Sequence, residues 1–192
     1  MAAISTVFTV TNLNAKIMKN VIVLFMALLI GSSLLFAQEV SNKSMMKEEK
    51  ANKAYAATRA LIESGQFEFI ADRLIASTGY TKSIITTPNN IRIKGEQVEV
   101  YLPYFGEARA NTPYMADGGI KYKGLMEDYT VEFKDDKRRA IVRFSIDKGI
   151  EEHNFIMTIH REGNSRVTVI SSGRTSISYY GDTGALEDVS GF

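Results

Sequence analysis

The chain contains no cysteine among its 192 residues. Disulfide bonds, thiol nucleophiles, iron–sulfur clusters and thiolate zinc sites are therefore excluded, and so is the lipid-modified cysteine of bacterial lipoproteins. The chain also lacks an excess of either charge. Its net charge is +1, and removing Lys16 and Lys19, the only charges in residues 1–37, makes it −1. A nearly neutral chain has no electrostatic field for nucleic acid, whose binding depends on neutralising phosphates.

Sequence motifs of common enzymes are missing as well. The chain contains no G-x-S-x-G nucleophile elbow, no H-E-x-x-H, no G-x-G-x-x-G and no P-loop. Each of these motifs places a catalytic or phosphate-binding group on a particular turn. Their absence favours a non-catalytic protein. An enzyme whose catalytic groups come from distant strands stays open as an alternative.

The long apolar run lies near the N-terminus. Lys16 and Lys19 precede the unbroken run Val21–Ile30, Gly31 and two serines break it, and Leu35-Phe36-Ala37 precedes Gln38. A positive start, an apolar stretch and a small residue at the cut are the layout of a secretory signal peptide. We therefore predict that residues 1–37 are a signal peptide cleaved after Ala37.

This prediction sets the expected location. A protein without its signal peptide and without cysteine is expected in the periplasm or outside the cell, with no remaining membrane contact. The alternative is a retained anchor, but the 16 residues 21–36 fall short of the ~20 that a spanning helix needs and are interrupted by Gly31 and two serines. A compact signal peptide would start at Met18, so residues 1–17 are interpreted as an over-long gene start.

A helix is predicted over residues 45–64, after a flexible linker at 38–44. One stripe of apolar and small side chains recurs at spacings of three and four, which is the period of a helix face. Gly65 fits the position after the last helical turn. The stripe consists of Ala51, Ala54, Tyr55, Thr58, Leu61 and Ile62.

Downstream of Phe67 the apolar period changes from 3.6 to 2, which is typical of strands with one buried face. The clearest alternation runs from Tyr129 to Tyr179, with short polar turns between the segments. Loops this short join antiparallel neighbours. We therefore predict one α+β domain over 45–192, with the helix packed on an antiparallel β-meander of seven to nine strands. A curved sheet, an open barrel and a sandwich all fit.

The segment Pro103–Gly124 is predicted to be a long loop, and such loops are often functional. Aromatic rings and a few polar groups gather in and beside it, a composition that suits a small ligand. The alternative is that these rings plug the end of the sheet. The candidate ligand-binding residues are Tyr101, Tyr104, Phe105, Arg109, Tyr114, Asp117, Lys121 and Tyr122.

Histidines and acidic residues give no second candidate site. His153 and His160 are seven residues apart, so on one strand their side chains point to opposite faces and cannot share a metal. Three acidic pairs fall at predicted turns and strand ends, where solvated carboxylates are expected; they are Glu127-Asp128, Asp135-Asp136 and Glu151-Glu152. We predict no metal and no cofactor.

Three segments carry a family resemblance: Val98–Arg109 with its Leu-Pro-Tyr-Phe-Gly element, Asp117–Tyr122, and Ser171–Gly181. Together with the signal peptide and the helix, they resemble the DUF4251 family, exported proteins of unknown function from Bacteroidetes-type bacteria. The resemblance covers residues 48–185. It implies an exported single-domain protein, and it implies no activity and no functional residues.

The sequence thus favours an exported, non-catalytic binding module for the cell envelope or the exterior. Its expected partner is a small ligand or an envelope protein. Two alternatives remain: a hydrolase with its site at the 102–122 loop, built from Arg109, Asp117 and a histidine, and a purely structural or assembly protein.

Overall fold

The computed structural model describes residues 43–86, 89–105, 119–147, 149 and 151–186. The chain divides into two compact units, Met1–Lys50 and Ala51–Phe192. In the first unit the description covers only the helical residues 43–50, so the predicted signal peptide lies outside the described residues. Within the described ranges, no helix combines the length and the apolar character needed to cross a membrane.

The predicted helix is present and runs over residues 43–63. In the second unit its residues Ala51, Tyr55, Thr58 and Ile62 are buried, which confirms most of the predicted stripe, while Ala54 and Leu61 are partly exposed. Gly65 follows the end of the helix, as predicted, and adopts a φ of 63° that an L side chain disfavours.

An antiparallel sheet follows the helix. The strands among the described residues are β1 (Gln66–Ala76), β2 (Thr81–Ser83), β3 (Asn90–Lys94), β4 (Gln97–Pro103), β5 (Gly119–Leu125), β6 (Glu127–Lys134), β7 (Arg139–Asp147), β8 (Glu152–His160), β9 (Asn164–Ser171) and β10 (Ile177–Ala185). Nine of them form the order β5-β4-β3-β1-β10-β9-β8-β7-β6, and β2 pairs with β1. A short 3₁₀ turn, η1 (Asp135–Lys137), joins β6 to β7.

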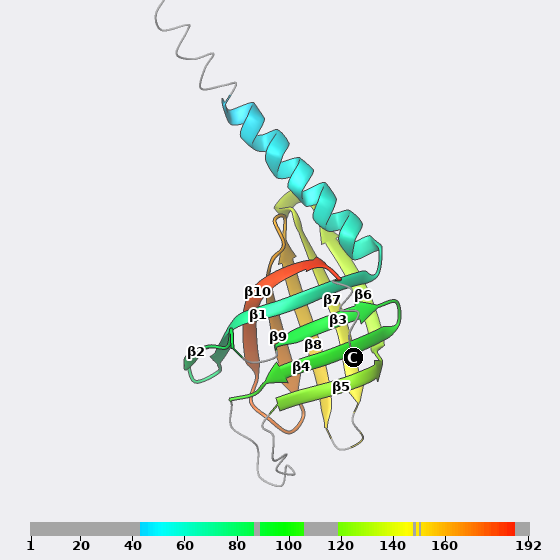
Figure 1. Cartoon of the computed structure of the whole chain (residues 1–192). Coiled ribbons are helices and arrows are strands. Elements are labelled where there is room, and N and C mark those ends of the chain that lie inside the picture. Colours follow the sequence, from blue (N-terminus) through cyan, green and yellow to red (C-terminus); the bar gives the residue numbers. More distant parts are fainter. Residues whose placement is uncertain (1–42, 87–88, 106–118, 148, 150, 187–192) are drawn as a thin grey trace, which may run out of the picture. The chain divides into compact units, whose positions relative to one another are not determined.

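The sheet curls into a half-barrel. Of the three predicted architectures, this one corresponds to the open barrel. Strands β5 and β6 lie at opposite ends of the strand order, yet only Met126 separates them in sequence. The two edges must therefore approach each other at this corner. In Figure 1, strands β1, β3, β4 and β5 cross the direction of β7, β8 and β9.

Strands β1 and β10 bend where the two halves meet. Their register shifts between Ala71 and Arg73, so Asp72 has no partner on β10. Opposite the shift lies Gly181, whose backbone comes so close to β1 that a Cβ atom would lie 2.8 Å from the Ala71 Cα. A β-bulge with a glycine partner is a usual way to turn a strand at a barrel corner.

The core fills the space inside the curl. The buried residues recur at every second position, as the sequence predicts, for example Phe67 and Phe69 on β1. Phe144 and Phe155 stack across β7 and β8 with ring centroids 4.6 Å apart, and the Tyr179 side chain is wholly buried. One part of the prediction is wrong: residues 119–124 of the predicted loop belong to strand β5.

Candidate functional site

The structure divides the predicted ligand-binding residues into three groups. Arg109, Tyr114 and Asp117 lie outside the described residues. The remaining five are Tyr101, Tyr104, Phe105, Lys121 and Tyr122. They do not converge on one site, because side chains alternate between the two faces of a strand and β4 continues as far as Pro103.

Tyr101, Phe105 and Lys121 face outward. Tyr101 on β4 lies opposite Lys121 on β5, and the Lys121 Nζ is 5.0 Å from the centroid of the tyrosine ring. The Phe105 ring lies 3.7 Å from the Nζ of Lys82, a residue of β2 that the sequence did not single out. We call these four residues the aromatic–lysine surface. Its rings are 36% and 41% exposed.

Tyr104 and Tyr122 instead pack against the core. The Tyr104 hydroxyl donates to the carbonyl oxygen of Thr175 at 2.8 Å, and the Tyr122 hydroxyl donates to that of Leu125 at 2.7 Å. This packing against the core is what the alternative interpretation, rings that plug the end of the sheet, expects of these two side chains.

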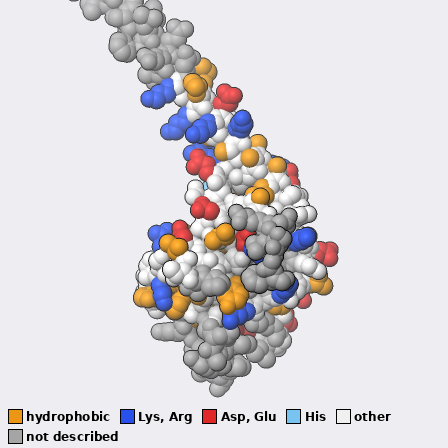
Figure 2. Space-filling model, in the orientation of Figure 1, with side chains coloured by type: hydrophobic (Ala, Val, Ile, Leu, Met, Phe, Trp, Pro, Cys, Tyr) orange, Lys and Arg blue, Asp and Glu red, His pale blue; other side chains and the backbone are white. Residues whose placement is uncertain are grey.

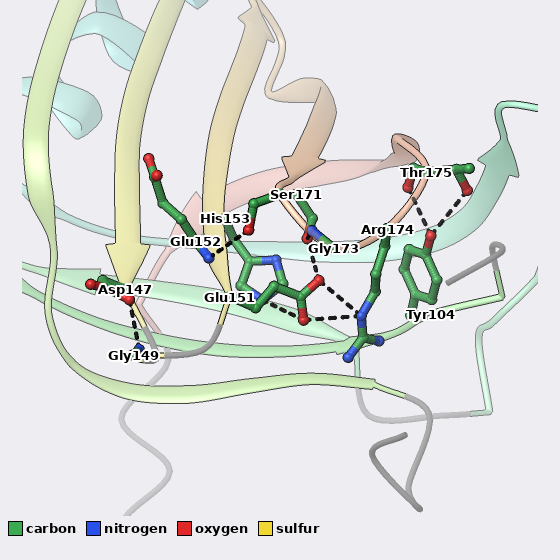
Figure 3. Close-up of polar contacts among 11 residues, drawn as sticks. Tyr104, Asp147, Gly149, Glu151, Glu152, His153, Ser171, Gly173, Arg174 and Thr175 are labelled. Atoms are coloured by element: carbon green, nitrogen blue, oxygen red, sulfur yellow. Dashed lines mark hydrogen bonds and ion pairs between the residues drawn. The ribbon is translucent and has the colours of Figure 1, made fainter. Parts of the chain in front are cut away.

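A second group of polar side chains lies buried at the end of the half-barrel (Figure 3). Glu151 Oε1 and Oε2 each lie 3.1 Å from the Nε of Arg174. The Ser171 hydroxyl donates to the same carboxylate, and the Nε2 of His153 is 3.7 Å from Glu151 Oε2. The guanidinium of Arg174 lies 5.0 Å from the centroid of the Tyr104 ring.

Strand pairing explains why these residues meet. Glu151 directly precedes β8, Ser171 ends β9, and His153 and Ser171 are paired between the two strands. Arg174 follows three residues after Ser171, in the connection between β9 and β10. Antiparallel neighbours place the start of one strand beside the end of the next. The two connections therefore meet at one end of the half-barrel.

The predicted solvation of the acidic pair Glu151-Glu152 is wrong for its first member. The Glu151 side chain is buried among partners that supply positive charge and hydrogen bonds, as a buried carboxylate requires. The predicted opposite orientation of the two histidine side chains is confirmed, since His153 is 1% exposed and faces inward whereas His160 faces solvent.

This buried group does not form a nucleophilic site. A serine nucleophile needs a base within hydrogen-bond distance of its hydroxyl, but the Ser171 hydroxyl donates to a carboxylate that is paired with Arg174. Ser171 and His153 are both buried, and the His153 Nε2 faces the Glu151 carboxylate and not the Ser171 hydroxyl. Nor do three or more metal-ligating side chains gather anywhere in the described part of the chain.

The charge pattern of the surface gives no further site. Figure 2 shows one face of the molecule, on which lysine and arginine side chains are interspersed with acidic ones. Charges are also paired across strands: the buried Glu68 with Arg92 at 2.9 Å, and the exposed Lys123 with Glu99 at 3.7 Å. Mixed charge of this kind is typical of a solvated sheet face.

Comparison with known proteins gives a family and a fold. Residues 49–183 match the family model DUF4251, a domain of unknown function. The chain is similar to the crystal structure of a DUF4251 family protein from Bacteroides eggerthii, with a TM-score of 0.55 and 17% sequence identity. The match covers 69% of this chain and 87% of that one. No curated protein matches the chain.

Proposed function

We propose that this chain, which belongs to the DUF4251 family, is an exported, non-catalytic binding module whose ligand docks on the aromatic–lysine surface. The observation that carries the proposal is the exposure of the Tyr101 and Phe105 rings, each within 5.0 Å of a lysine ammonium group. Aromatic side chains are enriched in binding interfaces relative to the rest of a protein surface.

The filled interior supports binding on the outside. The described inward-facing side chains of the half-barrel, such as Phe69, Phe155 and Tyr179, are almost wholly buried against one another. A ligand inside the curl would have to displace them. An outer surface formed by β2, β4 and β5 offers recognition without repacking the core.

The chemistry of the surface favours an acidic saccharide. The two ammonium groups of Lys82 and Lys121 attract carboxylates, and the rings of Tyr101 and Phe105 offer apolar faces for the C–H groups of a sugar. The acidic side chain closest along β4, Glu99, is paired with Lys123. Lys82 and Lys121 therefore supply the positive charge of this surface.

Export rests on the sequence, where Lys16, Lys19 and the apolar run up to Ile30 have the layout of a cleaved signal peptide. Mass spectrometry of the protein secreted by its native host tests this part. The mature chain is expected to begin at Gln38. A chain that keeps its first 37 residues would contradict the proposal.

Binding is tested with oligogalacturonates, which carry a carboxylate on every ring, against neutral oligogalactose of the same length. The double variant Tyr101→Ala/Phe105→Ala is expected to weaken oligogalacturonate binding about tenfold or more by calorimetry. The matched control is Tyr129→Ala on β6, because Tyr129 is also 36% exposed but lies elsewhere.

Three results would contradict the proposal. The first is that no acidic saccharide binds. The second is that Tyr129→Ala weakens binding as much as the double variant. The third concerns catalysis: release of shortened saccharides by the purified protein would make it a hydrolase.

A further inference from the structure

Arg174 has more N–H donors than its pairing with the Glu151 carboxylate uses. Only 7% of it is exposed. A guanidinium carries five N–H donors, one on Nε and four on the two terminal nitrogens. In Arg174 the Nε is held by both oxygens of Glu151, at 3.1 Å each.

The terminal nitrogens of Arg174 are directed elsewhere. Figure 3 shows that Nη1 and Nη2 point away from the Glu151 carboxylate. Among the described residues, neither nitrogen has a hydrogen-bond partner. A buried arginine that served only to pair with a carboxylate is expected to use two parallel N–H groups in a bidentate pair. Here only the Nε side of the group is used.

The guanidinium is also fixed in place. Tyr104 lies against it at 5.0 Å, and the tyrosine hydroxyl is itself held by the Thr175 carbonyl oxygen at 2.8 Å. On the other side, the Glu151 carboxylate is held by the Ser171 hydroxyl. An arginine oriented by its neighbours loses little conformational freedom when it binds a ligand.

We propose that the Nη1–Nη2 edge of Arg174 binds the carboxylate of a small ligand, with Tyr104 as the wall of the site. Two parallel N–H groups match the two oxygens of a carboxylate. The Glu151 carboxylate lies on the Nε side, so the bound carboxylate occupies the opposite edge and the two anions are separated by the guanidinium. This site is distinct from the aromatic–lysine surface and does not depend on it.

Nitrogen-15 NMR of the arginine side chains in the intact mature protein tests the proposal. The probes are glucuronate and N-acetyl-alanyl-alanine, which present the same carboxylate on a sugar and on a peptide end, with glucose as the uncharged control. Both carboxylates, or one of them, are expected to shift the Arg174 side-chain resonances in a saturable way. Glucose is expected to leave them unchanged. The probe that binds more tightly shows whether the site prefers the carboxylate of a sugar or that of a peptide end.

The substitution Arg174→Lys tests whether the paired N–H groups, and not the positive charge alone, bind the carboxylate. Arg174→Lys keeps the positive charge beside Glu151 but removes the paired N–H groups, and it is expected to weaken carboxylate binding about tenfold or more. The control Arg143→Lys alters an outer residue of β7 and is expected to change nothing. A two-dimensional amide spectrum verifies that Arg174→Lys folds. If it does not fold, the NMR titration of the unsubstituted protein still decides the question.

Either of two results would overturn the proposal: saturating carboxylate without a shift at Arg174, or a folded Arg174→Lys variant with unchanged affinity. The variant Tyr101→Ala/Phe105→Ala is expected to keep the Arg174 response. Failure at one site therefore remains distinguishable from failure at the other.

Discussion

The substitution Gly181→Ala tests the corner that closes β10 against β1. A Cβ atom at position 181 would lie 2.8 Å from the Ala71 Cα and against the Ile70 carbonyl oxygen. Carbon atoms in contact prefer separations of about 3.5–4.0 Å, so the strands would have to separate by roughly 1 Å. Both obstacles are backbone atoms, which cannot turn aside as a side chain does. Overpacking of a core costs about 1–3 kcal/mol, and we expect Gly181→Ala to reach about 3 kcal/mol.

Urea denaturation followed by far-ultraviolet circular dichroism measures this loss. The midpoint is expected to fall while the slope stays unchanged, because the surface exposed on unfolding is the same. Gly184→Ala is the matched control, since it lies on the same strand with no atom within 4 Å of its would-be Cβ. That variant is expected to stay within ~0.5 kcal/mol of the parent protein. Equal midpoints for the two variants would refute the bulge argument.

Three further predictions concern buried groups. Burial, together with the hydrogen bond that its hydroxyl donates to Asp135, raises the pKa of Tyr55 from 10.0 to about 12. The unfolding free energy should therefore decline as the pH rises from about 10 to about 12, because only the unfolded chain loses this proton there. Urea denaturation at several pH values in this range measures the decline. Tyr55→Phe is the control, since it lacks the hydroxyl group and with it this part of the pH dependence. Glu151→Met leaves Arg174 without its counter-charge and should cost about 3–5 kcal/mol, whereas Glu151→Met/Arg174→Met should recover most of the loss in the same urea assay. Phe69→Ala should cost about 3–5 kcal/mol by calorimetric melting, since it opens a cavity in a wholly buried position.

Much of the fold could be predicted because buried side chains recur in the sequence with the period of the helix or strand that carries them. The stripe through Tyr55 and Ile62 predicts the helix, and the alternation from Tyr129 to Tyr179 predicts β6 to β10 with their turns. Strand β5 was missed although Ile120, Tyr122 and Gly124 alternate with Lys121 and Lys123. The glycines beside it indicated a loop, and only pairing with β4 shows that it is a strand.

The corner between β1 and β10 could not be predicted. The bulge at Asp72 depends on which strand lies beside β1, and that partner comes about a hundred residues later in the chain. Likewise, Glu151 was predicted to be a solvated turn residue because its sequence neighbours are polar. Its burial depends on Arg174, which the chain brings back only after two further strands. The local sequence pattern indicates which face of a strand is buried. It does not indicate which connections between strands lie side by side in the fold.

The same reasoning explains why the predicted aromatic site separated into two. Tyr104 and Phe105 are neighbours in the chain, directly after the last residue of β4. Tyr104 lies against Arg174, while Phe105 lies against Lys82. One strand end thus supplies an aromatic ring to each of the two proposed sites. Because the two rings contact different partners, Tyr101→Ala and Arg174→Lys, which leave residues 104 and 105 unchanged, are the substitutions that remove the two binding activities one at a time.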